Sequence, residues 1–356
     1  MIKSCFYITY VFLLSITLQY SYSQSKTLRF EHLTTESGLP RNQVTSLMQD
    51  NVGYIWTGTG DGLSRYDGYR FKTFNNRTSN LSGKHVVNIY EDREDVLWVA
   101  TNKGFSKFNK ATELFENFTI DSPSVSGENL LHATKIFEDN KNQFWIGSKK
   151  GLFQFNRKEK TINRDWSNHI LKNKLDESKI TTLFQDSKNR LWVGTFSNGV
   201  FLISWGIGNE IKEINNYTHK PEDITTINHN RIEDIKEDIN GGIWVATRGG
   251  LNKLNDNNKL NIEEYVFQKI HNPFKKEVTY YDMLSSITVD QNNNLFVGHL
   301  NGLYYLPNGS DTLENIDIIT NDPRLKHNYT MNSQFIDKSG VLWLTSSNGI
   351  YKHDLF

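Results

Sequence analysis

The sequence repeats itself seven times, and this repetition restricts the folds available to the chain. Each repeat contains an apolar run, an aspartate, an aromatic residue six positions later and then a turn glycine. The aspartates are Asp50, Asp92, Asp139, Asp186, Asp238, Asp290 and Asp337. The aromatic residues are Trp56, Trp98, Trp145, Trp192, Trp244, Phe296 and Trp343. The glycines are Gly62, Gly104, Gly151, Gly199, Gly250, Gly302 and Gly349.

The first repeat divides into four short strands separated by turn residues. We predict the strands at Val44–Met48, Ile55–Thr59, Leu63–Tyr66 and Arg70–Phe74. A helical solenoid would need apolar residues at i, i+3, i+4 and i+7, and the repeats lack this spacing. Four-stranded units repeating every 42 to 52 residues are typical of β-propeller blades. The sequence therefore predicts an all-β fold, a seven-bladed β-propeller over residues 24–356.

The blade motifs lie near 44–74, 86–118, 133–156, 180–203, 232–255, 284–306 and 331–356. The seventh motif ends after its third strand, so it lacks a fourth. The segment Leu28–Leu33 resembles the fourth strand of the first repeat at Tyr69–Phe74. We predict that residues 28–33 pair with the last blade, because this closes the ring and leaves no open sheet edge.

The first 23 residues are typical of a secretory signal peptide. Lys3 precedes an apolar run, Cys5–Leu18, and the small residues Ser21 and Ser23 follow it. A membrane anchor is the alternative, but the apolar run has about 14 residues where a spanning helix needs about 20. We therefore expect a signal peptide at residues 1–23 and a periplasmic location. Cys5 is the single cysteine, which excludes a disulfide framework and a zinc site built from cysteines.

The sequence contains no recognised catalytic motif. It lacks G-x-S-x-G, H-E-x-x-H and the phosphate-binding P-loop pattern, so we expect no catalytic residue, no metal site and no cofactor. Forty basic residues balance forty acidic ones, and this segment is not expected to bind nucleic acid. The functional alternatives for the repeated residues are calcium binding by the aspartates and sugar stacking on the tryptophans. We interpret both as structural, with Asp bonding its own turn and Trp filling the space between blades.

Binding residues are expected where the repeats differ. In a propeller, the connections between blades and the turns after the second strands fall on one face, and their lengths vary here. Candidate ligand-binding residues on this face are His85, His132, Lys149, Lys150, Lys179, Arg231, Arg248, Trp166, Tyr217 and Tyr281, with Phe196 close to them in the sequence. Two interpretations stay open: a site for an acidic or hydroxyl-rich ligand, or an ordinary solvated rim.

Several motifs resemble the two-component-regulator propeller repeat. The matching segments are Gln49–Thr59, Asp61–Asp67 and Gln185–Thr195, while Leu33–Pro40 resembles the start of the periplasmic sensor region of Bacteroidetes-type hybrid two-component histidine kinases. The resemblance covers residues 28–356. It implies an oligosaccharide ligand and a homodimer. It also implies a longer chain with a second propeller, an immunoglobulin-like domain, a membrane helix, a histidine kinase, a receiver and a DNA-binding domain.

The first hypothesis is therefore a periplasmic sensing propeller that binds an oligosaccharide and signals to a histidine kinase outside this chain. Two alternatives come from other classes. One is an exported propeller enzyme, a lyase or hydrolase acting on acidic polysaccharide, and the other is a solitary propeller that binds proteins. Because the sequence stops after one propeller, it is either a fragment of a longer sensor or a solitary protein. The residues do not identify the sugar.

Overall fold

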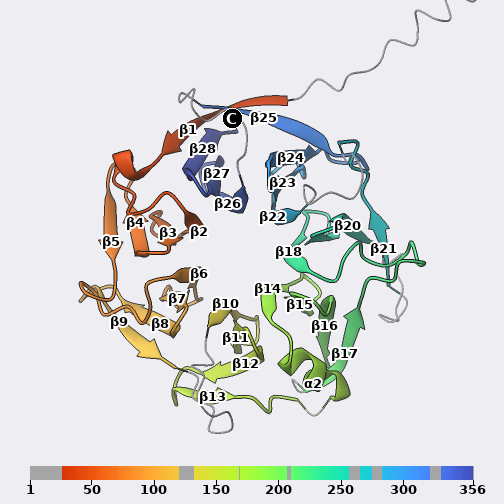
Figure 1. The fold of residues 1–356 in the computed structure, drawn as a ribbon. Helices are drawn as coiled ribbons and strands as arrows, with labels where there is room; N and C mark the ends of the chain where they lie inside the picture. The colour runs from red at the N-terminus through yellow and green to blue at the C-terminus, as the bar shows by residue number, and fades with distance from the viewer. Residues whose placement is uncertain are drawn as a thin grey trace, which may run out of the picture.

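Seven blades stand around a central opening in a computed structural model of the chain (Figure 1). The structure describes residues 26–119, 132–167, 169–206, 210–255, 265–274, 283–320 and 330–355. Five blades are separate four-stranded sheets, and the last two join through β1 into one eight-stranded sheet. The predicted seven-bladed propeller is confirmed. The predicted signal peptide lies outside the described residues.

The strands of each blade follow one another outward from the centre. The first strands are β2 (Val44–Gln49), β6 (Val86–Glu91), β10 (Ala133–Glu138), β14 (Ile180–Gln185), β18 (Ile232–Glu237), β22 (Leu284–Val289) and β26 (Met331–Ile336). The second strands are β3 (Ile55–Thr59), β7 (Leu97–Thr101), β11 (Phe144–Ser148), β15 (Leu191–Thr195), β19 (Ile243–Thr247), β23 (Leu295–His299) and β27 (Val341–Ser346).

The outer half of each blade is less regular. The third strands are β4 (Gly62–Tyr66), β8 (Gly104–Asn109), β12 (Gly151–Asn156), β16 (Val200–Trp205), β20 (Gly250–Asn255), β24 (Gly302–Leu306) and β28 (Gly349–Asp354). The fourth strands are β5 (Phe71–Phe74), β9 (Leu114–Phe118), β13 (Thr161–Asn163), β17 (Ile211–Tyr217), β21 (Val266–Lys269) and β25 (Glu314–Thr320). The four strands predicted in the first repeat agree with β2 to β5 to within one residue at each end.

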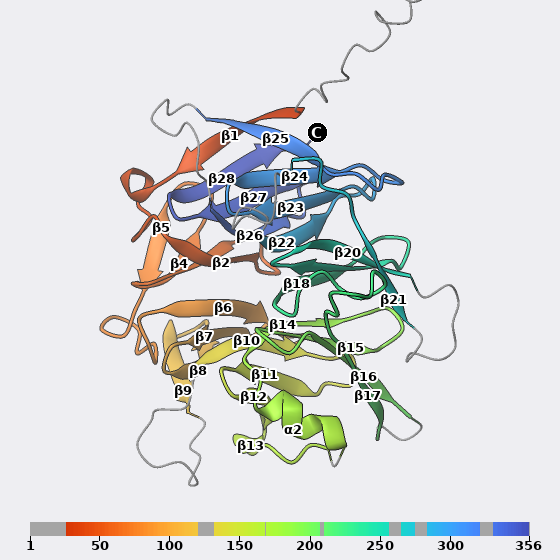
Figure 2. The same cartoon turned by 45° about the vertical axis from the view of Figure 1, so that its right-hand side comes forward.

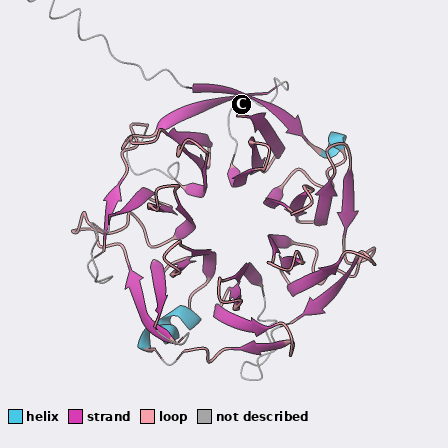
Figure 3. Cartoon of the chain, turned by 180° about the vertical axis from the view of Figure 1, so that it is seen from behind, coloured by secondary structure: helices cyan, strands magenta, loops and turns pink. Residues whose placement is uncertain are grey.

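Two helical segments lie at the periphery (Figure 3). A 3-10 helix spans Thr35–Ser37, and α2 spans Ile170–Asp176 in the connection between blades three and four. The side chain of His169 caps α2 by accepting a hydrogen bond from the Leu171 N–H at 3.2 Å, while Leu175 is fully buried in the core of the neighbouring blades. This connection is therefore packed structure, where the sequence suggested a variable loop.

The repeated aspartate forms a hydrogen bond with the repeated tryptophan. In six blades the indole Nε1 donates to the aspartate Oδ2 at 2.7 to 2.9 Å. The other carboxylate oxygen accepts backbone N–H groups of the same turn, as it does in Asp139 from Lys141 and Gln143. Both residues are structural, as the sequence indicated. The bond between them was not predicted.

Blade six replaces this tryptophan with Phe296, which has no N–H to donate. There the side-chain amide of Asn294 donates to Asp290 Oδ2 at 2.8 Å. Asp290 Oδ1 keeps its bonds to the backbone of Asn292 and Asn294. A second polar side chain thus satisfies the carboxylate oxygen where the indole is missing.

Neighbouring blades are joined on the face of the aspartate turns. A Gln or Glu at the end of the first strand accepts the N–H of the residue after the aspartate of the preceding blade. The acceptors are Gln49, Glu91, Glu138, Gln185 and Glu237. Between blades five and six, Asn293 accepts the Ile239 N–H instead, at 2.8 Å. Between blades six and seven this position is Ile336, which cannot accept a hydrogen bond.

The strand β1 (Lys26–Leu33) spans that same junction. Its second half pairs antiparallel with β28 of blade seven, with Glu31 opposite Lys352, which confirms the predicted closure. Its first half pairs parallel with β25 of blade six, with Leu28 opposite Ile318, and Figure 2 shows β1 lying alongside β25. The pairing with blade six was not predicted. One strand thus closes the ring and also ties the last two blades together.

The residue that ends the second strand differs in blade six, and this difference predicts that the stability of the fold depends on pH. Six second strands end in Ser or Thr, whereas β23 ends in His299, 4% exposed and stacked on Tyr304 with ring centroids 3.9 Å apart. Burial lowers the pKa of His299 from 6.5 to about 4. Its imidazole is therefore neutral in the folded protein and takes up a proton more readily in the unfolded chain.

Acidification should therefore destabilise the protein through His299. The loss begins as pH falls through 6.5 and is complete below pH 4, reaching about 2 kcal/mol between pH 7 and 4.5. Urea unfolding of wild type and His299→Thr at both pH values measures it, because other titrating groups are common to both proteins. Equal pH dependence in the two proteins would contradict the assignment.

Candidate functional site

The residue before each first strand lies on the rim of the central channel, since the first strands are the innermost (Figure 1). In blades two to five, its carbonyl accepts a hydrogen bond from the turn after the second strand of the same blade. The pairs are Asn102 to His85, Lys149 to His132, Phe196 to Lys179 and Arg248 to Arg231, at 2.9 to 3.3 Å. The two sets of loops therefore share one face, as predicted.

Six of the predicted site residues gather along this rim, and we call them the basic arc. Its members are His85, His132, Lys149, Lys179, Arg231 and Arg248. They belong to the four consecutive blades two to five. On blades six, seven and one, the residues before the first strands are Met283, Thr330 and Gln43. Among these seven positions, the basic residues thus fall on four consecutive blades.

The cations of the basic arc are close enough to affect one another. Burial lowers the pKa of Lys179, and the charges of Arg231 and Lys149 lower it further. Burial likewise lowers the pKa of His132, helped by Lys149 and His85. The lowered pKa values mean that the surroundings of Lys179 and His132 favour the neutral forms of both side chains. At neutral pH, His132 is an uncharged imidazole that can donate and accept hydrogen bonds.

A carboxylate that the sequence analysis missed organises two of the arginines. Glu233, in β18, forms ion pairs through Oε1 with Arg231 Nε at 2.5 Å and Arg248 Nε at 3.7 Å. Burial raises the pKa of Glu233, against the opposing effect of Arg231. The sequence signal was available, because Glu233 is the one acidic residue at the second position of the first strands.

Phe196 supports the neighbouring cations. The Arg231 guanidinium lies 4.1 Å and the Lys179 ammonium 4.6 Å from the centre of its ring. The ring remains 38% exposed, so it presents an apolar surface among the charges. Such cation–π contacts restrict the positions of long side chains that would otherwise be free. Phe196, Glu233 and the basic arc together form the candidate site at the mouth.

Two other candidates, Lys150 and Trp166, have different surroundings. Lys150 is exposed in the turn beside Lys149, and its backbone N–H donates to Ser148 Oγ. Trp166 packs edge-on against Trp145 and donates its indole N–H to the Leu152 carbonyl at 2.8 Å. These contacts give Trp166 a packing role. Tyr281 lies outside the described residues.

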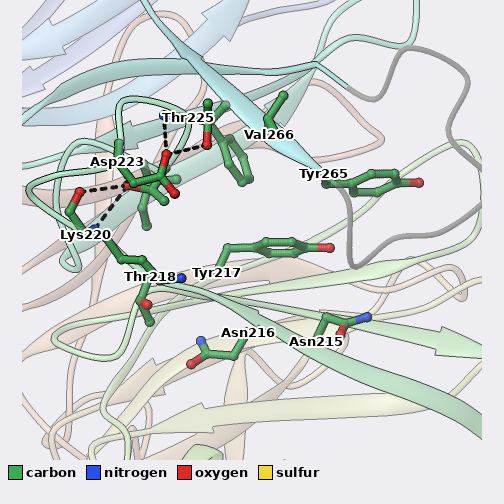
Figure 4. A pocket seen from close by; sticks show the side chains of 12 residues that line it. Asn215, Asn216, Tyr217, Thr218, Lys220, Asp223, Thr225, Tyr265 and Val266 are labelled. Atoms are coloured by element: carbon green, nitrogen blue, oxygen red, sulfur yellow. Dashed lines mark hydrogen bonds between the residues drawn. The ribbon is translucent and has the colours of Figure 1, made fainter.

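Tyr217 lines a pocket on the outer side of blades four and five, with a volume of about 330 Å³. Figure 4 shows its ring roughly parallel to that of Tyr265, and the two centroids are 6.3 Å apart. Asp223 and Thr225 form the opposite wall through a tight loop. The connection that forms this wall continues to Arg231, so the pocket and the mouth are adjacent along the chain but distinct.

The channel wall holds one further charged pair that the sequence analysis missed. Burial lowers the pKa of Lys135, in β10, while Asp234, in β18, opposes this effect. Asp234 also accepts the backbone N–H of Ile287 at 2.9 Å and so joins blades five and six. The other first strands carry Ser, Thr or Asn at this third position, and the charged residues in two blades were a usable signal.

Two features of the described residues concern metal binding and membrane insertion. In this part of the chain, no three His, Cys, Asp or Glu side chains are grouped so that they could hold a metal ion. Among the helices described, none has the length and apolar character needed to cross a membrane.

Comparison with known proteins assigns the repeats. The family model described as "Two component regulator propeller" matches residues 38–61, 80–103 and 174–197, which lie in blades one, two and four. Three of the seven repeats are therefore two-component regulator propeller repeats. A 54-residue stretch is 37% identical to "Histidine kinase P4" of Formosa agariphila, covering 15% of this chain and 4% of that protein. The chain thus spans a small part of this curated relative.

Solved structures of similar fold include both sensors and enzymes. The extracellular domain of a putative hybrid two component system from B. thetaiotaomicron matches with a TM-score of 0.69 at 20% identity, covering 92% of this chain and 42% of that one. Virginiamycin B lyase from Staphylococcus aureus matches with a TM-score of 0.64 at 12% identity, covering 93% and 99%. At these identities the likeness shows the propeller fold alone.

Proposed function

We propose that the two-component regulator propeller described above is the ligand-sensing part of a larger hybrid two-component sensor. In this proposal it acts in the periplasm, binds an oligosaccharide and signals to a histidine kinase outside this chain. The observation that carries the proposal is the basic arc with Phe196, which lies on the loop face of a propeller built from these repeats. A rigid ring that positions variable loops is suited to ligand recognition.

Binding would occur at the mouth of the channel. The neutral imidazole of His132 and the arginine donors suit sugar hydroxyl groups, and Phe196 offers a face on which a sugar ring packs. Signalling then follows if the ligand binds one arrangement of a homodimer more tightly than another. Sedimentation of the propeller with and without ligand tests the dimer.

Replacing Arg231 and His132 together with Ala should weaken oligosaccharide binding by about tenfold or more, because both side chains lie on the proposed rim. Titration calorimetry against a panel of oligosaccharides measures this effect. The matched control is Asp223→Ala in the outer pocket, which should leave the affinity unchanged. A loss of binding in Asp223→Ala with no change in the rim variant would move the site to the pocket beside Tyr217.

The link to a kinase is tested separately in the source cells. An immunoblot against the propeller should show a membrane-bound product far larger than the 41.3 kDa of this chain. A periplasmic product of about the chain's own mass would exclude a kinase on the same polypeptide. Screens for enzymatic activity on acidic polysaccharides or for protein partners would then follow.

A further inference from the structure

The basic arc carries more positive charge than the surrounding protein neutralises. Lys149, Lys179, Arg231 and Arg248 are cationic, whereas Glu233 is the one carboxylate among the described residues that forms an ion pair with them. The charges are also partly desolvated, since the Nε atoms of both arginines are inaccessible to solvent. Partly buried positive charges without counter-ions are costly, and a bound anion removes that cost.

The arginines are held ready for such an anion. Glu233 contacts Arg231 and Arg248 through their Nε atoms, and the Arg231 guanidinium lies over the ring of Phe196. Each guanidinium carries four further N–H donors on its two Nη atoms. In the described part of the chain, these Nη donors have no hydrogen-bond acceptor. Two pre-positioned guanidinium groups suit the paired oxygens of a carboxylate or sulfate.

We propose that the ligand of this propeller is an acidic oligosaccharide whose carboxylate or sulfate group binds between Arg231 and Arg248. The proposal rests on the function proposed above and narrows it to one class of sugar. Neutral sugars offer hydroxyl groups that hydrogen-bond to the rim but leave its excess charge uncompensated. The repulsion among Lys149, Lys179 and Arg231 favours the anion further, because a negative group between them relieves it.

Matched pairs of saccharides test the proposal by titration calorimetry. The first pair is an oligogalacturonate tetrasaccharide and its carboxyl-reduced form, which differ only in the acid group. The second pair is a sulfated galactan tetrasaccharide and its desulfated form. We expect an acidic member of one pair to bind at least about tenfold more tightly than its neutral counterpart, with an affinity that falls as salt rises. Which pair responds distinguishes a carboxylate from a sulfate.

Variants at the mouth make the test specific. Arg231→Gln with Arg248→Gln should weaken the acidic ligand by about tenfold or more. Glu233→Gln should strengthen it several-fold, because glutamine keeps an oxygen that accepts from the arginine Nε atoms but removes the negative charge that repels an anion. A purely structural role for Glu233 would give no such increase. Lys158→Gln, a cation removed from a turn of blade three outside the basic arc, is the matched control and should change nothing.

The possible failures are distinguishable. Equal affinity for acidic and neutral members, with both weakened by the arginine variants, would overturn the acidic-ligand proposal and leave oligosaccharide sensing at the mouth in place. Binding of neither kind, or binding that ignores every rim variant, would overturn the sensing function itself. If the double arginine variant does not fold, the opposite effect expected for Glu233→Gln still decides the acidic-ligand proposal.

Discussion

Removal of residues 26–33 should abolish cooperative folding of the propeller. Leu28, Phe30 and Leu33 are 8%, 1% and 6% exposed, and burying side chains of this size stabilises a fold by about 1.5 to 3 kcal/mol each. The deletion also leaves β25 and β28 without their shared partner. The combined loss approaches the total stability of a typical domain, about 5 to 15 kcal/mol.

Chemical unfolding of a chain beginning at Thr34 measures this effect against the intact protein. We expect a broad transition without a clear midpoint, since blades six and seven and the ring closure all lose a strand. Phe30→Ala is the milder version and should cost about 3 to 5 kcal/mol. The neighbouring Arg29→Ala, on an exposed position of the same strand, should change stability by less than about 0.5 kcal/mol. An unchanged midpoint and slope in the deletion would refute closure by β1.

The second large effect is expected for Asp139→Asn. Asp139 is fully buried, and its Oδ2 accepts the Trp145 indole N–H at 2.9 Å. The asparagine either turns its amide N–H toward the indole or withdraws its oxygen from the backbone of Lys141 and Gln143. Either way, at least one buried donor loses its acceptor. The expected cost is about 3 kcal/mol, from a lost charge-assisted bond and an unsatisfied buried group.

A double-mutant cycle with Trp145→Phe isolates the bond. Phe296 shows that the fold accepts phenylalanine at this position, and phenylalanine has no N–H to leave unpaired. In the Trp145→Phe background, Asp139→Asn should therefore cost about 1 to 2 kcal/mol less than in the wild type. The measurement is urea unfolding of the four proteins at neutral pH. The same cost in both backgrounds would show that the bond to the indole contributes nothing.

The first of these effects rests on a part of the fold that was predictable from sequence, whereas the Asp139–Trp145 hydrogen bond behind the second was not predicted. The seven repeats indicated seven blades because each repeat carries its own strands and turns. The resemblance of residues 28–33 to a fourth strand indicated the closure on blade seven. The parallel pairing of β1 with β25 was not predictable, because it depends on how blade six lies next to blade seven. Ile336 marks the same junction, where the polar acceptor of other blades is missing.

In the candidate site, some residues were predictable from sequence and some contacts were not. The position before each first strand indicated His85, His132, Lys179 and Arg231, because in a propeller that position always meets the channel. The sequence did not indicate that Glu233 would bind two of the arginines, or that Trp166 would pack against Trp145. Both depend on where neighbouring blades and loops bring side chains that are distant in the sequence or on different turns.

The sequence by itself determined the fold class, the number of blades and the face that carries the variable loops. These follow from local patterns that repeat, since each blade forms from residues close together in the chain. Only the tertiary structure decided which charges meet, because the mouth combines residues from four blades. It also separated the pocket of Tyr217 from the basic arc, although one connection joins them. The repeated residues determined the structure of each blade. The residues that differ between repeats determined the chemistry of the mouth, because ring closure brings them together.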